Sequence, residues 1–91
     1  MNELEIFEEC VRKWGLNAQL LMLAEESGEL VQATLHMFRR AKQENALEHL
    51  KEEMADVKLM INQIQYFLKL EEDINKIYNQ KIEKLKVRLG V

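Results

Sequence analysis

Residues 20–31 read LLMLAEESGELV, and the predicted fold is built around them. The first five of these residues are apolar all round a helix, and such a segment needs packing partners on more than one side. Three carboxylates follow inside this core-like run. On a helix, Glu26 and Glu29 lie about 60° apart on one face, and Glu25 lies about 40° beyond Glu29. Because an unpaired buried carboxylate is costly, we expect a positive partner nearby, and a metal ion is the simplest one.

A second acidic cluster follows at residues 52–56, which read EEMAD. Glu53 and Asp56 repeat the spacing of three residues that separates Glu26 from Glu29. Acidic pairs at this spacing are common on helices, so neither cluster is specific by itself. The two clusters fall on different predicted helices, and an antiparallel hairpin between those helices would bring the carboxylates together.

The joint pattern is EExxE and then, after a gap of 23 residues, ExxD. This pattern, in a small helical chain, resembles the all-α nucleoside triphosphate pyrophosphohydrolases of the MazG type. The resemblance covers residues 14–88. The matching residues are Glu25, Glu26, Glu29, Glu53 and Asp56.

The resemblance implies a metal centre and a reaction. Oxygen ligands without His or Cys favour a hard cation, so the expected cofactor is Mg²⁺, with Mn²⁺ as an alternative. The family's ligands for the metal that binds the nucleoside triphosphate would be Glu26, Glu29, Glu53 and Asp56. Attack at the α-phosphorus would release pyrophosphate and a monophosphate. Glu25 would bind a second ion or position the attacking water, which makes it the expected catalytic residue.

Three further residues are candidates for substrate binding. Trp14 precedes the first acidic motif, where it either anchors packing or stacks on a nucleobase. Lys81 and Lys84 share a face of the last predicted helix with Arg88. This face is either a solvated basic surface or, as the family's basic residues in this region imply, a contact for phosphates.

The first two predicted helices have clear start and stop signals. Asn2 can cap the first helix, with Glu5 as its reciprocal partner, and Gly15 suits its end. The second helix is expected from about residue 17 to residue 43. A tight turn at residues 43–45 follows.

The third predicted helix begins after Asn45, which can cap it. Its apolar residues between 47 and 68 alternate at spacings of three and four, which is a knobs-into-holes pattern. The pattern pauses near residue 70, so the chain either breaks there or continues as one long helix. We expect the break, partly because the resembled family has a helix here that folds back. Gly90 suits the final cap.

Composition limits the class of protein. The 91 residues make one domain, residues 1–91, and the absence of Pro with only three Gly favours long helices. We expect an all-α antiparallel bundle of about four helices, completed by self-association as a homodimer or homotetramer. The net charge of −3 and the lack of a basic block argue against a nucleic acid polymer as partner.

The cellular location of the protein is predicted from signals that the sequence lacks. The single cysteine, Cys10, favours a reducing interior, and the acidic N-terminus is unlike a signal peptide. No apolar run approaches the ~20 residues of a membrane span. The sequence therefore predicts a cytoplasmic protein with no membrane partner.

Two other functions compete with the nucleotide hydrolase. A di-iron carboxylate bundle usually draws Glu-x-x-His pairs from two helices, but Ala33 and Ala46 stand three residues before His36 and His49. Neither histidine is an expected metal ligand. The alternative that stays open is a non-catalytic helical coiled-coil interaction or regulatory module. The alternating apolar residues between 47 and 68, which we call the apolar seam, would suit such a module. Its binding should not depend on Mg²⁺.

Overall fold

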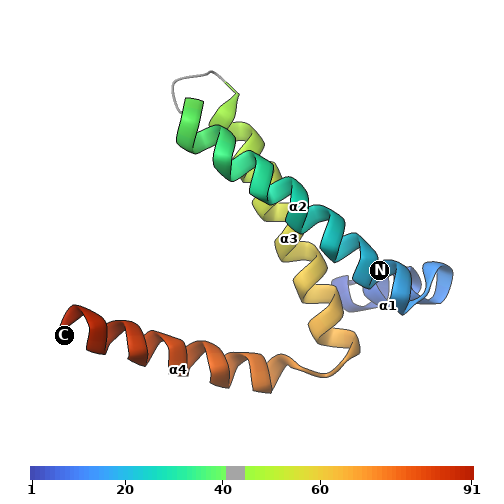
Figure 1. Ribbon diagram of the computed structural model, residues 1–91. Helices are drawn as coiled ribbons and strands as arrows, with labels where there is room; N and C mark the ends of the chain where they lie inside the picture. The colour runs from blue at the N-terminus through green and yellow to red at the C-terminus, as the bar shows by residue number, and fades with distance from the viewer. Residues whose placement is uncertain (41–44) are drawn as a thin grey trace.

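The computed structural model describes residues 1–40 and 45–91, which form four helices and no strand (Figure 1). The helices are α1 (Glu3–Trp14), α2 (Leu16–Arg40), α3 (Ala46–Phe67) and α4 (Glu71–Leu89). The prediction of an all-α helical bundle is confirmed. Within the described residues, no helix combines the length and the apolar character that crossing a membrane requires.

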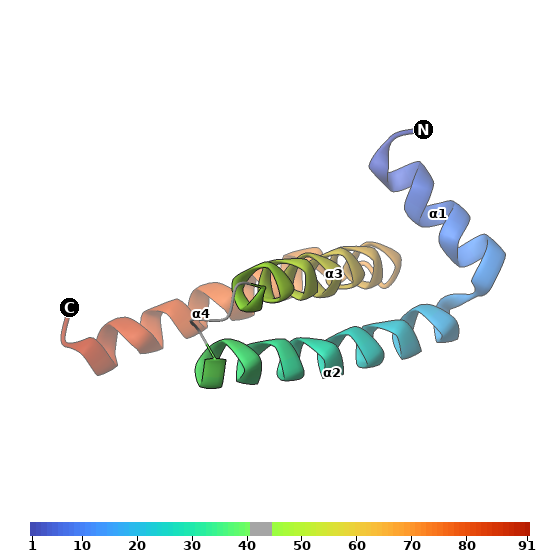
Figure 2. The same ribbon diagram turned by 90° about the horizontal axis from the view of Figure 1, so that it is seen from above.

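The centre of the fold is an antiparallel hairpin of α2 and α3, whose axes run side by side in both views (Figures 1 and 2). Small and apolar side chains fill the space between the two helices. Ala33 of α2 and Met60 and Ile64 of α3 are buried there. The hairpin thus sets the middle of α2 against the middle of α3, where the two acidic clusters of the sequence lie.

α1 lies across the open end of the hairpin, where α2 begins and α3 ends (Figure 2). Phe7 is the buried residue of α1, and its ring lies 6.3 Å from that of Tyr66 on α3. The Tyr66 hydroxyl donates a hydrogen bond of 2.8 Å to Glu8 Oε1. One buried ring and one hydrogen bond therefore hold α1 against α3.

The ends of α1 follow the predicted signals. Asn2 Oδ1 accepts a hydrogen bond of 2.9 Å from the Glu5 backbone N–H, although no reciprocal bond from the Glu5 side chain is found among the described residues. Gly15 ends the helix at φ 85°, a left-handed value that suits glycine. The next helix begins at Leu16, one residue before the predicted start.

The entry into α3 differs from the prediction. Asn45 has φ −103° and ψ 3°, and its side chain makes no capping hydrogen bond. The predicted cap is therefore wrong, because a side-chain cap requires an extended backbone at that position. The predicted extension of the second helix to residue 43, and the turn at residues 43 and 44, lie outside the described residues.

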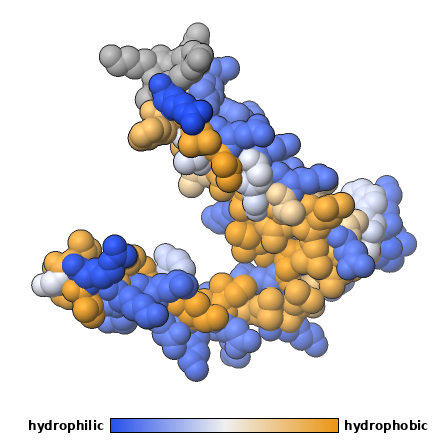
Figure 3. All heavy atoms as spheres, in the orientation of Figure 1, coloured by the Kyte–Doolittle hydropathy of each residue, from blue (hydrophilic) through white to orange (hydrophobic). Residues whose placement is uncertain are grey.

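The break near residue 70 is confirmed. α3 ends at Phe67, Lys69 has a left-handed φ of 55°, and α4 begins at Glu71 with three acids in its first turn. α4 has no buried residue and leaves the hairpin at an open angle instead of folding back onto it (Figure 1). Hydrophobic side chains remain on the surface along α4 and at its corner with the hairpin (Figure 3).

Candidate metal centre

Three of the predicted metal ligands come together in the hairpin. Glu26, from the middle of α2, and Glu53 and Asp56, one turn apart on α3, each place one carboxylate oxygen within 4.8 Å of the other two. The i, i+3 spacing aims both α3 carboxylates at the same side, and the antiparallel packing supplies the third from α2. Nearby carboxylates repel one another, so this arrangement favours a bound cation.

The surroundings of these carboxylates strengthen that preference. Glu53 is only 8% exposed, and the Oε2 atoms of both Glu26 and Glu53 are buried without a hydrogen-bond partner among the described residues. Buried polar atoms in folded proteins are normally satisfied. Oxygen atoms with no protein partner, in a set that contains only carboxylates, fit a hard cation such as Mg²⁺ or Mn²⁺.

The pKa values of the cluster move in the direction expected of crowded carboxyl groups. Burial is the largest cause that raises the pKa of Glu26, and the negative charges of Glu29, Asp56 and Glu53 add to it. Burial is also the largest cause that raises the pKa of Glu53, and the negative charges of Glu29 and Asp56 add to it. A divalent cation at this position would oppose both shifts, because its positive charge stabilises the ionised form of the carboxyl groups.

Glu29 and Glu25 differ in their relation to the cluster. Glu29 is exposed, but its charge is the largest electrostatic cause of the raised pKa in both Glu26 and Glu53, so it borders the cluster. Glu25 is exposed and does not belong to the cluster. The structure therefore places Glu29 beside the three grouped carboxylates and Glu25 further round α2.

His49, which the sequence places one helical turn before Glu53 and does not predict as a metal ligand, lies next to Glu53 in the structure. His49 Nε2 is 3.9 Å from Glu53 Oε1, and its charge opposes the rise in the Glu53 pKa. His49 Nδ1 is also 3.4 Å from His36 Nδ1 on α2. The signal in the sequence is the spacing of four residues from His49 to Glu53, which puts both on one helix face.

A cavity of about 400 Å³ lies one helical turn from the acidic cluster, a size within the ~300–1,000 Å³ range of small-molecule sites. Met22 precedes Glu26 by four residues on α2, and Met60 follows Asp56 by four residues on α3, so the same face of the hairpin carries both sites. We call this the α1 cavity because α1 closes one side of it. Its lining consists of Cys10, Trp14, Ala18, Gln19, Met22, Met60 and Gln63.

The α1 cavity combines apolar walls with two amides. Gln19 and Gln63 are 7% and 5% exposed, and Gln63 Oε1 is buried without a hydrogen-bond partner in the described part of the chain. Trp14 is 57% exposed and has the Lys13 ammonium 5.3 Å from its ring centre. Sequence reasoning singled out Trp14 but missed both glutamines, whose burial depends on the packing of α2 against α3.

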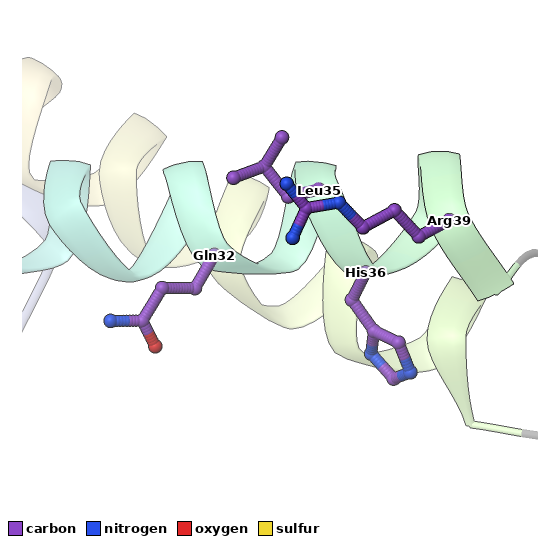
Figure 4. Close-up of a pocket in the computed structure, with 4 residues that line it drawn as sticks. All are labelled: Gln32, Leu35, His36 and Arg39. Atoms are coloured by element: carbon purple, nitrogen blue, oxygen red, sulfur yellow. The ribbon is translucent and has the colours of Figure 1, made fainter.

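The predicted phosphate contacts lie elsewhere. Lys81 and Lys84 line an open pocket on α4 with Leu85 and Arg88, and no described contact brings them to the acidic cluster within one chain. Another surface pocket, of about 340 Å³, is formed near the end of α2. Figure 4 shows that its labelled side chains all come from α2, with Arg39 extending back toward Leu35. Neither pocket has walls from two packed helices.

Comparison of this chain with family models, with curated proteins and with solved structures finds no match. The functional assignment therefore depends on the geometry of the acidic cluster and the α1 cavity.

Proposed function

We propose that this chain is a magnesium-dependent nucleoside triphosphate pyrophosphohydrolase of the MazG type, which converts a ribo- or deoxyribonucleoside triphosphate to the monophosphate and pyrophosphate. The observation that carries the proposal is the convergence of Glu26, Glu53 and Asp56, with buried oxygens that have no protein partner. The adjacent α1 cavity has a size suited to a nucleoside. In this role the protein would act on the cytoplasmic nucleotide pool.

The carboxylates would hold the metal and the reacting water. Glu26, Glu53 and Asp56 are the proposed ligands, and Glu29 completes the set at its exposed edge. When bound, Mg²⁺ would neutralise the triphosphate and lower the pKa of a water molecule. Water oxygen attacks the α-phosphorus, the bond from this phosphorus to the bridging oxygen breaks, and pyrophosphate leaves. Glu25 is the proposed acceptor of the water proton.

The α1 cavity would hold the base and sugar. Trp14 offers an exposed ring for stacking, and stacking on an aromatic ring contributes about 1–3 kcal/mol per base. The Gln63 carbonyl oxygen, buried and without a partner among the described residues, would accept a hydrogen bond from the edge of the base. Gln19 lies in the same cavity and offers a second amide. Base selection is therefore assigned to the glutamines and affinity to the tryptophan.

The test is pyrophosphate release from a panel of ribo- and deoxyribonucleoside triphosphates, with Mg²⁺ and with chelator. Glu53→Gln keeps the size of the side chain and removes one ligand charge, so turnover should be lost while helix content by circular dichroism stays. Glu52→Gln is the matched control, because Glu52 is exposed and outside the cluster. Near-normal turnover in Glu53→Gln would contradict the proposal.

A non-catalytic helical interaction module is the second candidate, and the exposure of large apolar residues on α2, α3 and α4 favours it. Such a module has no need for a divalent cation. If folded protein releases no pyrophosphate from any nucleotide, and its melting temperature does not respond to Mg²⁺, this candidate replaces the hydrolase.

A further inference from the structure

The two histidines of the chain meet across the α2–α3 hairpin. His36 lies near the end of α2, His49 lies near the start of α3, and both are half-buried. Each follows a fully buried alanine by three residues, Ala33 on α2 and Ala46 on α3. The small alanines let the helices approach closely, and the spacing of three residues sets each histidine one turn further along the same face. The packing of the hairpin thus brings together two rings that the sequence did not predict to be neighbours.

The two rings present the same nitrogen to each other. His36 Nδ1 and His49 Nδ1 are 3.4 Å apart and the ring centres are 5.7 Å apart, so the nitrogens face each other nearly head on. Two nitrogens that bind one Zn²⁺ ion tetrahedrally, at about 2.0–2.1 Å each, lie about 3.3–3.4 Å from each other. The separation is therefore already that of two ligands of one ion. Turning each ring by about 35° would aim both lone pairs at that ion.

Glu53 supplies the neighbour that metal-binding histidines usually have. A histidine that binds a metal through one ring nitrogen normally donates its other N–H to a carboxylate or carbonyl oxygen, which fixes the orientation of the ring. His49 Nε2 lies 3.9 Å from Glu53 Oε1, and the Glu53 side chain is only 11% exposed. With Nδ1 on the ion, Nε2 carries the proton that faces this carboxylate. The negative charge of the carboxylate also favours a cation beside it.

The histidine pair can be reached from the surface through His36. Its ring lines the pocket of about 340 Å³ near the end of α2, together with Gln32, Leu35 and Arg39. Figure 4 shows the His36 ring leaving α2 on a different side from the Leu35 side chain, while Arg39 extends back toward Leu35. The positive charge of Arg39 is therefore directed away from the ring that an incoming ion would meet.

We propose that His36 Nδ1 and His49 Nδ1 together bind one divalent transition-metal ion, such as Zn²⁺, at a site beside the acidic cluster. Imidazole nitrogens suit Zn²⁺, whereas Mg²⁺ takes oxygen ligands, so the two neighbouring sites select different metals. The ion holds α2 against α3, and water fills its remaining positions. The unfolded chain does not hold the two nitrogens together, so metal binding stabilises the hairpin. This proposal does not rest on the hydrolase activity.

The experiment adds Zn²⁺ to the full chain in the presence of excess Mg²⁺, which occupies oxygen ligands but not imidazole. Nitrogen NMR of the histidine rings reports on the site directly, because the chain has only 2 histidines. We expect one Zn²⁺ ion per chain to shift the Nδ1 signals of both rings and to leave a proton on each Nε2. Ring signals that do not respond to Zn²⁺, a response from one ring alone, or binding through Nε2 would overturn the proposal without variants.

Single variants then assign the ligands. Losing the hydrogen-bonded neighbour of a metal ligand costs about 10–100-fold in metal affinity, so losing a ligand itself should cost at least about 100-fold. We expect that loss in calorimetric Zn²⁺ titrations of His36→Ala and of His49→Ala, with helix content by circular dichroism unchanged. Cys10→Ser is the control, because the free thiol of Cys10 lies on α1 and is the other strong Zn²⁺ ligand outside the acidic cluster. Unchanged Zn²⁺ affinity in either histidine variant, or its loss in Cys10→Ser, would refute the assigned ligands.

Discussion

Replacing Phe7 by alanine should detach α1 from the hairpin. Phe7 is 3% exposed, and it is the buried residue of its helix. A buried Phe→Ala change costs about 3–5 kcal/mol. Natural domains have a total stability of about 5–15 kcal/mol, so this loss takes away a large share of it. At ~4–8 °C per kcal/mol for a domain of this size, the melting temperature should fall by at least about 12 °C.

The assay is thermal and urea unfolding followed by circular dichroism at one fixed protein concentration. Ile6→Ala is the matched control, since Ile6 is 46% exposed on the same helix and its loss should cost less than about 1 kcal/mol. α1 carries Cys10 and Trp14, so nucleotide binding in the α1 cavity should weaken with Phe7→Ala. The acidic cluster lies on α2 and α3, so the response to Mg²⁺ should remain.

Two results would refute this reasoning. The first is a loss below about 1 kcal/mol for Phe7→Ala, which would mean that the cavity left by the ring collapses or that α1 is held by other contacts. The second is an equal loss of unfolding free energy for Ile6→Ala, because the burial of the replaced side chain would then not explain how strongly it stabilises the protein.

Three further predictions concern the acidic cluster and the α1 cavity. In the absence of divalent ions, the raised pKa values of Glu26 and Glu53 mean that the folded chain binds more protons than the unfolded chain above about pH 4.3. Stability should therefore fall as pH rises from there through the raised pKa values, and Glu53→Gln should flatten the fall; unfolding in chelator across this range checks it. At a free Mg²⁺ concentration ten times its dissociation constant, the protein should gain about 1.4 kcal/mol. Glu53→Gln should abolish this gain and Glu52→Gln should keep it, whereas equal gains in differential scanning calorimetry would contradict the ligand assignment. Trp14→Ala should raise KM about 5- to 150-fold through lost stacking, and an unchanged KM in steady-state kinetics would assign Trp14 to packing alone.

The local structure of this chain could be predicted because its causes are local. Gly15 and Gly90 end helices at φ 85° and 74°, and Asn2 caps the first one with its own side chain. The pause in the apolar seam marks the break that follows Phe67. The Asn45 cap failed because the capping residue needs a particular backbone angle, which its neighbours in space help to set.

The candidate site also has a part that the sequence predicts and a part that depends on how the helices pack. The spacing of three residues in each acidic motif is a property of the helix, so the sequence alone determined that Glu53 and Asp56 share a face. That Glu26 joins them, and that Glu25 does not belong to the cluster, depends on the rotation of α2 against α3. The same rotation buries Gln19 and Gln63 beside the cluster and brings His49 toward His36. The residues in each of these groups come from different helices, so their spacing along the sequence does not predict that they lie close together.

The number of helices, most of their ends and the periodic placement of acids and apolar residues along each of them could therefore be predicted from the sequence. The packing of the helices was needed to show which apolar residues of α3 are covered, where the α1 cavity forms and that α4 leaves the hairpin. The physical reason is that helix formation depends on neighbours within about four residues. The rotation of one helix against another depends on the packing of all the side chains between them.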